Sequence, residues 1–296
     1  MPLSEHPLPR PLGDILTAPP GTALRLYWLG QAGWVIDGGG RRLVIDPYLS
    51  DTLAQKYAGT AHPHIRMMPA PAAPAAIAHV DAVLATHAHT DHLDPGTLPA
   101  LMAANPCAPL IAPTAHTALA CARAQIPPAR LITLDAGHTI TLPRAPDIGI
   151  TAIRAAHEDL TRDVAGHDVF LGYAMTLAAS CIYHAGDTVP FDGLAAEVAA
   201  LHPDLALLPV NGRDAARLAA GIPGNLTLTE AHDLARDAGI PAVIAHHFDM
   251  FDFNTVPRAD VEALETAGPP VLFRAAKTAT AFDLAPHSTG RRTDRT

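Results

Sequence analysis

The sequence predicts an α/β fold, formed as one domain from two similar halves. From residue 77 onward, short apolar runs alternate with segments of helical character, which is the pattern of layered α/β proteins. Hydrophobic residues make up 49% of the 296 residues, which is enough to build a sizeable core. No stretch with the composition of a linker separates the halves, so we expect one domain over residues 21–286.

The first half begins with a proline-rich segment, residues 1–20, which we expect to lie over the surface as an arm. Glycine-rich stretches then separate three short β-type runs, which indicates strands connected by hairpins at 24–29, 34–36 and 43–45. Residues 48–74 have no regular pattern, and a binding loop or a plain surface crossing would both fit, so we assign them no role. Beyond them, strands are expected at 82–85, 110–112 and 131–134 and helices at 97–104 and 116–124.

The second half repeats the alternation of strands and helices. The helix expected at 227–238 has a strong start signal, because Thr227 precedes Glu230 by three residues as in a capping box. Residues 287–296 are polar and are expected to form a frayed C-terminal tail. The other expected elements are strands at 148–155, 172–177, 181–184, 205–208, 243–245, 271–273 and 280–284 and helices at 194–201 and 258–266.

The composition argues against two classes of partner. A net charge of −9 and only two lysines disfavour binding to nucleic acid or to an anionic membrane. The three cysteines are unevenly spaced and form no C-x-x-C pair, which is typical of reduced thiols. We see neither a signal-peptide pattern nor an apolar run of transmembrane length. The sequence therefore predicts a soluble cytoplasmic protein.

A dense group of metal-binding side chains follows the apolar run 82–85. In an extended segment His87 and His89 point to the same side, whereas Asp91 and His92 follow where the chain turns and can face a second point. Imidazole nitrogens and carboxylate oxygens are ligands for zinc, iron or manganese. A merely polar loop is the alternative, but burying so many imidazoles without a metal or other partners is costly. These residues predict a metal site.

The same stretch resembles the H-x-H-x-D-H signature of the metallo-β-lactamase-fold hydrolases and matches it at every position. The sequence is more narrowly similar to the branch that contains L-ascorbate-6-phosphate lactonase. That similarity is carried by residues 27–30, 77–92, 182–188 and 242–254. The resemblance implies a four-layer αββα sandwich with two mixed sheets.

The resemblance also implies the ligands of two divalent metal ions, zinc or manganese. The last histidine has two candidates, His246 and His247, and alignment on Asp249 favours His247. The implied ligands are His87, His89 and His157 for one ion, Asp91, His92 and His247 for the other, and Asp187 shared between them.

The implied activity is that of a dinuclear metal-dependent hydrolase. A metal-bridged hydroxide, oriented by Asp91 as the catalytic carboxylate, would attack a lactone or ester carbonyl of a small polar substrate, with or without a phosphate group. A phosphodiesterase or phosphotriesterase that uses the same metal pair is the first alternative, and a non-hydrolytic iron redox protein is the second. The branch also leads us to expect a homo-oligomer.

Three further side chains are candidates to support the ligands. In the family, an acid at the end of the third strand holds the metal histidines, which gives Asp46 this role; a turn-forming residue before a proline is the equal alternative. His184 lies three residues before Asp187 and fits either support of the site or packing in the core. Asp249 lies just beyond His247 and fits either support of the site or contact with substrate.

Substrate contacts are expected from the loop after the strand at 205–208. Arg213 offers a bidentate fork for a phosphate or carboxylate, and Asn211 and Asn225 can bond hydroxyl groups. The alternative is that Arg213 pairs with Asp214 at the surface and that the asparagines form turns.

Overall fold

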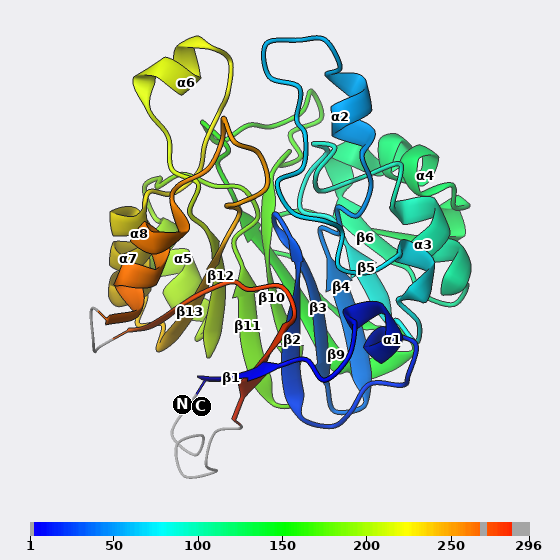
Figure 1. Cartoon of the computed structure of the whole chain (residues 1–296). Coiled ribbons are helices and arrows are strands. Elements are labelled where there is room, and N and C mark those ends of the chain that lie inside the picture. The colour runs from blue at the N-terminus through cyan, green and yellow to red at the C-terminus, as the bar shows by residue number, and fades with distance from the viewer. Residues whose placement is uncertain (1–2, 267–270, 286–296) are drawn as a thin grey trace.

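Two β-sheets face each other in the computed structural model, and helices cover the outer face of each (Figure 1). The structure describes residues 3–266 and 271–285. Both sheets combine parallel and antiparallel strands. This αββα arrangement confirms the fold class that the sequence predicts. The tail expected at 287–296 lies outside the described residues.

The larger sheet has eight strands. They are β1 (Leu3–Pro7), β2 (Leu24–Gly30), β3 (Gly33–Gly38), β4 (Arg41–Ile45), β5 (Ala82–Leu84), β6 (Leu110–Pro113), β7 (Leu131–Leu134) and β15 (Thr280–Leu284). Their order is β1-β15-β2-β3-β4-β5-β6-β7, with antiparallel pairs as far as β4 and parallel pairs beyond it. The hairpins expected between the first three predicted strands are therefore confirmed.

The smaller sheet has seven strands. They are β8 (Thr139–Leu142), β9 (Ala145–Arg154), β10 (Leu171–Leu177), β11 (Ser180–His184), β12 (Leu205–Pro209), β13 (Ala242–His246) and β14 (Leu272–Ala275). Their order is β14-β13-β12-β11-β10-β9-β8, parallel from β14 to β11 and antiparallel from β11 to β8.

The helices form the two outer layers. Those against the larger sheet are α1 (Leu12–Leu16), α3 (Leu98–Ala104) and α4 (Thr117–Ala124). Those against the smaller sheet are α5 (Leu194–Leu201), α7 (Leu228–Asp237) and α8 (Arg258–Ala263). Two short helices, α2 (Thr52–Lys56) and α6 (Ala215–Ala219), lie at one end of the molecule, opposite the end where β1 lies (Figure 1). Single 3₁₀ turns are η1 (Pro74–Ala76), η2 (Thr114–His116), η3 (Pro128–Arg130) and η4 (Leu264–Thr266). Among the described residues, no helix is both long and apolar enough to cross a membrane.

The central strands are apolar on both faces because each face meets a different layer. In β2, Leu26 and Trp28 enter the core between the sheets, whereas Tyr27 and Leu29 pack under the outer helices. A strand buried on both sides reads as a continuous apolar run rather than as an alternating one. This explains why the sequence shows these strands clearly.

The structure adds elements that the sequence does not predict, and most of them are short. In the segment expected as an arm, β1 pairs with β15 and α1 buries Leu12 and Leu16. In the second half, β8 pairs with β9, and α6 spans only five residues. The segment 48–74 contains α2, which also has five residues. Helices of this length are marginal on their own, so contacts with the rest of the fold hold them.

Candidate metal centre

The candidate ligands come together from the ends of strands in both sheets. The loop from His87 to His92 follows β5 in the larger sheet. In the smaller sheet, His157 lies just beyond β9, Asp187 just beyond β11, and His247 directly after β13. Because the two sheets face each other, these loops meet at one edge of the sandwich.

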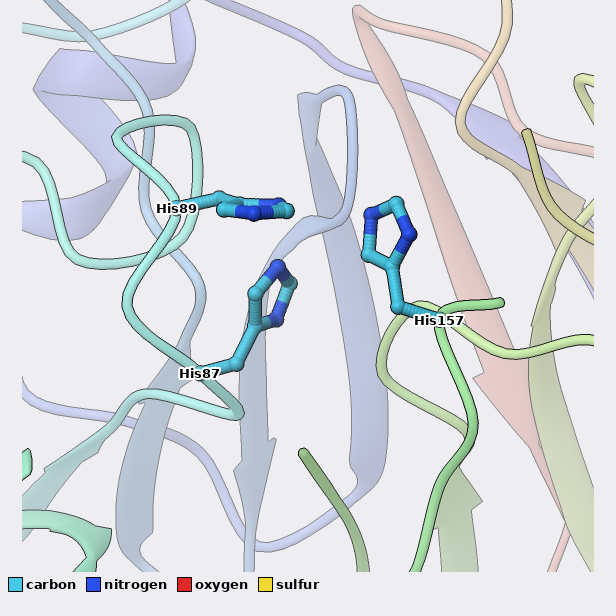
Figure 2. A group of neighbouring side chains, drawn as sticks. All are labelled: His87, His89 and His157. Carbon is cyan, nitrogen blue, oxygen red and sulfur yellow. The ribbon is translucent and has the colours of Figure 1, made fainter. Parts of the chain in front are cut away.

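Three histidines form the first group. Figure 2 shows that His87 and His89 extend from the same loop and that His157 reaches toward them from the other sheet. The ring centroids of His87 and His89 lie 4.6 Å apart, and those of His89 and His157 lie 4.7 Å apart. One ring nitrogen from each of the three lies within 4.8 Å of the others, so a single cation can contact all three.

A second group forms around the carboxylate of Asp187. One ligand atom each from Asp91, His92 and His247 lies within the same 4.8 Å limit. Asp187 lies between the two groups: its Oδ2 is 3.4 Å from His157 Nε2 and 3.3 Å from His92 Nε2, and its Oδ1 is 3.2 Å from His247 Nε2. This position suits a carboxylate shared by two cations, as the sequence leads us to expect. His246 is not in either group.

Burial and neighbouring charges set the protonation of these groups. Burial, reinforced by nearby histidines, lowers the pKa of His87 well below its ordinary value and that of His89 to about 4, so both rings are neutral near pH 7 and keep a lone pair for a metal. Burial alone would raise the pKa of Asp187, but His247 and His92 outweigh it and hold that pKa well below the usual range. The carboxylate is therefore ionised. Burial alone would lower the pKa of His92, but Asp187 and other carboxylates raise it well above the ordinary value.

Several buried polar atoms in this centre have no hydrogen-bond partner among the described residues. They include Nε2 of His87, of His92 and of His247, and Oδ1 of Asp187. Leaving one such atom without a partner costs about 1–3 kcal/mol. These four atoms belong to the side chains that cluster as candidate ligands, and bound cations would satisfy them. The donors are nitrogen and carboxylate oxygen, a set that zinc, manganese and iron all accept.

Asp46 and Thr86 orient two of the histidines. The buried carboxylate of Asp46 accepts from His92 Nδ1 at 2.7 Å and from the Thr86 amide and hydroxyl at 2.8 and 2.7 Å. Because the Thr86 hydroxyl gives its proton to Asp46, it can accept from His87 Nδ1, which lies 3.1 Å away. With a cation bound, both rings would keep their proton on Nδ1 and offer Nε2 as the ligand atom. Of the two roles considered for Asp46, the contacts match support of the histidines.

Gln31, which sequence reasoning missed, ties three parts of the site together. Its side-chain amide donates to Asp91 Oδ2 at 2.8 Å. Its main-chain carbonyl oxygen accepts from the main-chain amide of His247 and from Trp28 Nε1, both at 3.0 Å. Gln31 has a φ of 51°, in the left-handed region, inside the tight turn between β2 and β3. The glycines that flank this turn, Gly30 and Gly33, were the only signal in the sequence.

His184 and His246 lie beneath the site rather than in it. His184 Nε2 donates to the carbonyl of Ala32, and His184 Nδ1 accepts from the amide of Gly186, the residue before Asp187. This links the β2–β3 turn to the loop that carries the shared carboxylate, so His184 is both packed in the core and a support of the site. Trp34 Nε1 lies 3.2 Å from His246 Nδ1 and donates to it, which holds that ring away from the ligand groups.

The expected substrate contacts from the loop after β12 differ from what the structure shows. Arg213 makes a bidentate ion pair with Glu230, with both contacts at 2.6 Å. Glu230 also closes the capping box at the start of α7. Asn211 and Asn225 are buried and bond to each other at 3.0 Å. None of these three side chains lines the cavity described next. Asp249 is paired with Arg258 and is also absent from the lining.

A cavity of about 1010 Å³ opens onto the ligand groups. Segment 48–74 forms part of its wall through α2 and the residues after it, including His62 and His64. Asn254, which like Asp249 follows His247 and could face substrate, lines the cavity, and its side-chain oxygen accepts a hydrogen bond from Asn211. The irregular segment is therefore a wall of the site and not a plain surface crossing.

Comparison with known proteins agrees with this geometry. Residues 41–248 match the family model described as a beta-lactamase superfamily domain. A UPF0173 metal-dependent hydrolase from Cupriavidus taiwanensis is 30% identical over 216 residues, which cover 69% of this chain and 69% of that relative.

Solved structures show the same fold at lower identity. Igni18, a metallo hydrolase from Ignicoccus hospitalis, has a TM-score of 0.61 and 21% identity, covering 88% of this chain and 98% of its own. CmlA, a diiron β-hydroxylase from Streptomyces venezuelae, has a TM-score of 0.60 and 13% identity, covering 90% of this chain and 55% of its own. At such identities the likeness shows the fold alone, and one fold can carry different chemistries.

Proposed function

The chain belongs to the beta-lactamase superfamily and to the UPF0173 metal-dependent hydrolases, and we propose that it hydrolyses a lactone or ester of a small molecule with two divalent metal ions bound in the cavity. The observation that carries this proposal is the convergence of unpartnered buried imidazole nitrogens around the Asp187 carboxylate. Seven donor side chains in three overlapping groups are more than one cation of ordinary coordination number needs. Zinc and manganese are the metals we propose, because both accept this donor set.

The side chains of the site have distinct roles in this reaction. When bound, such metals acidify a water molecule and polarise the oxygen of the carbonyl under attack. Gln31 fixes Asp91 through Oδ2, which leaves Asp91 Oδ1 as the atom that can hold the proton of the attacking water. Asp46 and Thr86 keep the histidine rings in one tautomer and one orientation. Phe170 packs against the rings of His87 and His157 and excludes water from that side.

The choice of a lactone or ester rests on the similarity to the lactonase branch. A phosphate group on the substrate has less support. The expected anchor, Arg213, is engaged with Glu230. Of the lysines and arginines, only Lys56 and Arg123 line the cavity among the described residues, and Arg123 donates to main-chain carbonyls.

The first experiment is elemental analysis of protein purified without added metal, followed by assay on a panel of lactones and phosphodiesters. About two equivalents of zinc or manganese with turnover of lactones would support the proposal. Turnover of phosphodiesters alone would replace the proposed substrate class with the phosphodiesterase alternative. Iron in the preparation would favour the redox alternative, and absence of bound metal would overturn the mechanism.

Variants test the ligand assignment in the same preparation. His89→Ala and Asp187→Asn should lose metal and activity together, because each removes a donor from the groups described above. His138→Ala is the matched control, since that side chain is exposed and outside both groups. Full metal content in both ligand variants would show that the assignment is wrong.

A further inference from the structure

One wall of the cavity is built from aromatic rings. His62 and His64, in the segment after α2, lie against Phe251 and Phe253, in the segment after β13. The ring centroids of His64 and Phe253 are 4.6 Å apart, those of His64 and Phe251 are 5.0 Å apart, and those of His62 and Phe253 are 5.0 Å apart. All four side chains line the cavity. We call these four residues the aromatic wall.

The aromatic wall rests on a rigid base. The amide of Met67 donates to the carbonyl of Met250 at 2.9 Å, which joins the two segments. Phe251 belongs to a small apolar cluster with Tyr48, Leu53 and Met250, and Phe253 packs against that cluster. Tyr57, which also lines the cavity, stacks on His64, with centroids 4.2 Å apart and ring planes 19° apart. The rings therefore keep a fixed arrangement before any ligand binds, which lowers the entropy cost of binding.

His64 behaves as an aromatic ring rather than as a cation. Its Nδ1 donates to the main-chain carbonyl of His62 at 2.7 Å, so the proton is on Nδ1. Burial lowers the pKa of His64, which keeps the ring neutral near pH 7. Neutral imidazole and phenyl rings together offer flat apolar faces and edges to a ligand.

The charged residues of the cavity do not favour an anionic substrate. Glu158 and Asp159 line the cavity and are exposed, on the loop that carries His157. Arg123 donates to the main-chain carbonyl of Ala88 and so supports the loop between His87 and His89. Lys56 is left as the one lining lysine or arginine without such a hydrogen bond among the described residues. An apolar, uncharged part of a substrate suits these surroundings better than a phosphate does.

Building on the proposed function, we propose that the aromatic wall binds a planar apolar group of the substrate, so that the enzyme prefers lactones or esters that carry an aryl group. Such a group would stack on the ring of Phe253 and meet the ring of His64 edge to face, while the carbonyl faces the metal centre in the same cavity. This narrows the expected substrate class, and it replaces the small polar compound that the sequence suggests.

Two lactones that differ in one substituent test this inference. Both are γ-butyrolactones substituted at the ring carbon next to the ring oxygen, one with phenyl and the other with hydroxymethyl. For the holoenzyme we expect kcat/KM to be at least about 10-fold higher for the phenyl lactone, mainly through KM. In Phe253→Ala this ratio should fall by roughly 3- to 10-fold, the range expected for loss of one aromatic contact, while turnover of the hydroxymethyl lactone persists.

Two further variants separate stacking from folding. Phe253→Leu keeps apolar bulk but removes the ring, so it should retain the fold and still lose part of the preference. Phe191→Ala removes a phenyl ring that packs on the core outside the cavity lining, and it should leave the ratio unchanged. Equal kcat/KM for the two lactones, or an unchanged ratio in Phe253→Ala, would overturn the inference.

A separate binding measurement keeps this test independent of catalysis. If neither lactone is turned over, the proposed lactonase activity fails, but calorimetry with the two ring-opened hydroxy acids still examines the aromatic wall. Tighter binding of the phenyl acid that is lost in Phe253→Ala would support the inference. Equal affinities for the two acids would refute it.

Discussion

Replacing Asp46 with asparagine should weaken metal binding without removing a ligand. The wholly buried carboxylate accepts three hydrogen bonds, from His92 Nδ1 and from the amide and hydroxyl of Thr86. An asparagine side chain has one acceptor oxygen and one NH₂ group, which only donates. In either orientation of the amide, at least one of the three buried donors loses its partner. The tautomer and angle of His92 are then no longer fixed.

The size of the effect can be estimated in two ways. A buried donor left without an acceptor costs about 1–3 kcal/mol. Loss of the group that holds a histidine ligand typically weakens metal affinity by about 10- to 100-fold, which corresponds to about 1.4–2.7 kcal/mol. The two ranges agree, so we expect Asp46→Asn to bind metal about 10- to 100-fold more weakly than the parent protein.

Competition with a chromophoric chelator measures this affinity, and thermal unfolding of the metal-free protein measures the accompanying loss of stability. Asp37→Asn is the matched control, because Asp37 is also buried and makes a bidentate ion pair with Arg42 away from the ligand groups. We expect it to lose stability but to keep its metal affinity. Unchanged affinity in Asp46→Asn, or an equal loss in Asp37→Asn, would refute the reasoning.

Three other predictions concern the turn, the ion pair and pH. Gln31→Leu should lower kcat by about 10-fold while the protein keeps its metal, because the side-chain amide positions the carboxylate of Asp91 and is not itself a ligand of the cation. Loss of metal in parallel with the loss of kcat would contradict this. Arg213→Ala should reduce the free energy of unfolding by about 1 kcal/mol through its pair with Glu230 and leave kcat/KM unchanged, so a large rise in KM would restore the substrate role expected from the sequence. The metal-free protein should lose stability as pH falls from about 6.5 toward 4. The pKa of His87 and of His89 is lower in the folded protein than in the unfolded chain, so the unfolded chain takes up protons first in this window and is stabilised relative to the folded protein. Chemical denaturation at several pH values measures the effect. A free energy of unfolding that stays constant or rises as the pH falls would contradict the prediction.

The interior strands could be predicted because each carries its own signal. Strands β7 and β15 and helix α5 begin and end where the apolar pattern indicates. The start of α7 was equally clear, since its capping box lies within four consecutive residues. Helices α2 and α6 carry no comparable signal, because five residues are too few for a helical period and their contacts come from distant segments.

The metal ligands likewise divide into those that a local pattern predicts and those that it does not. The spacing of His87, His89, Asp91 and His92 identifies a metal-binding loop, and the remaining donors were matched by resemblance alone. Arg213 shows the limit of this approach: a guanidinium at the end of a strand fits an anion site equally well until its neighbour Glu230 is known. The choice between two local interpretations then depends on a residue in another element.

The sequence by itself determined the α/β class, the interior strands and the chemical type of the site, because these depend on patterns within a few neighbouring residues. Only the tertiary structure decided which groups hold the ligands and what surrounds them. Gln31 reaches Asp91 from the turn between β2 and β3, and the aromatic wall joins the segment after α2 to the segment after β13. Hydrogen bonds and ring contacts act over a few ångströms in space, and separation along the chain does not limit them, so no local pattern records them.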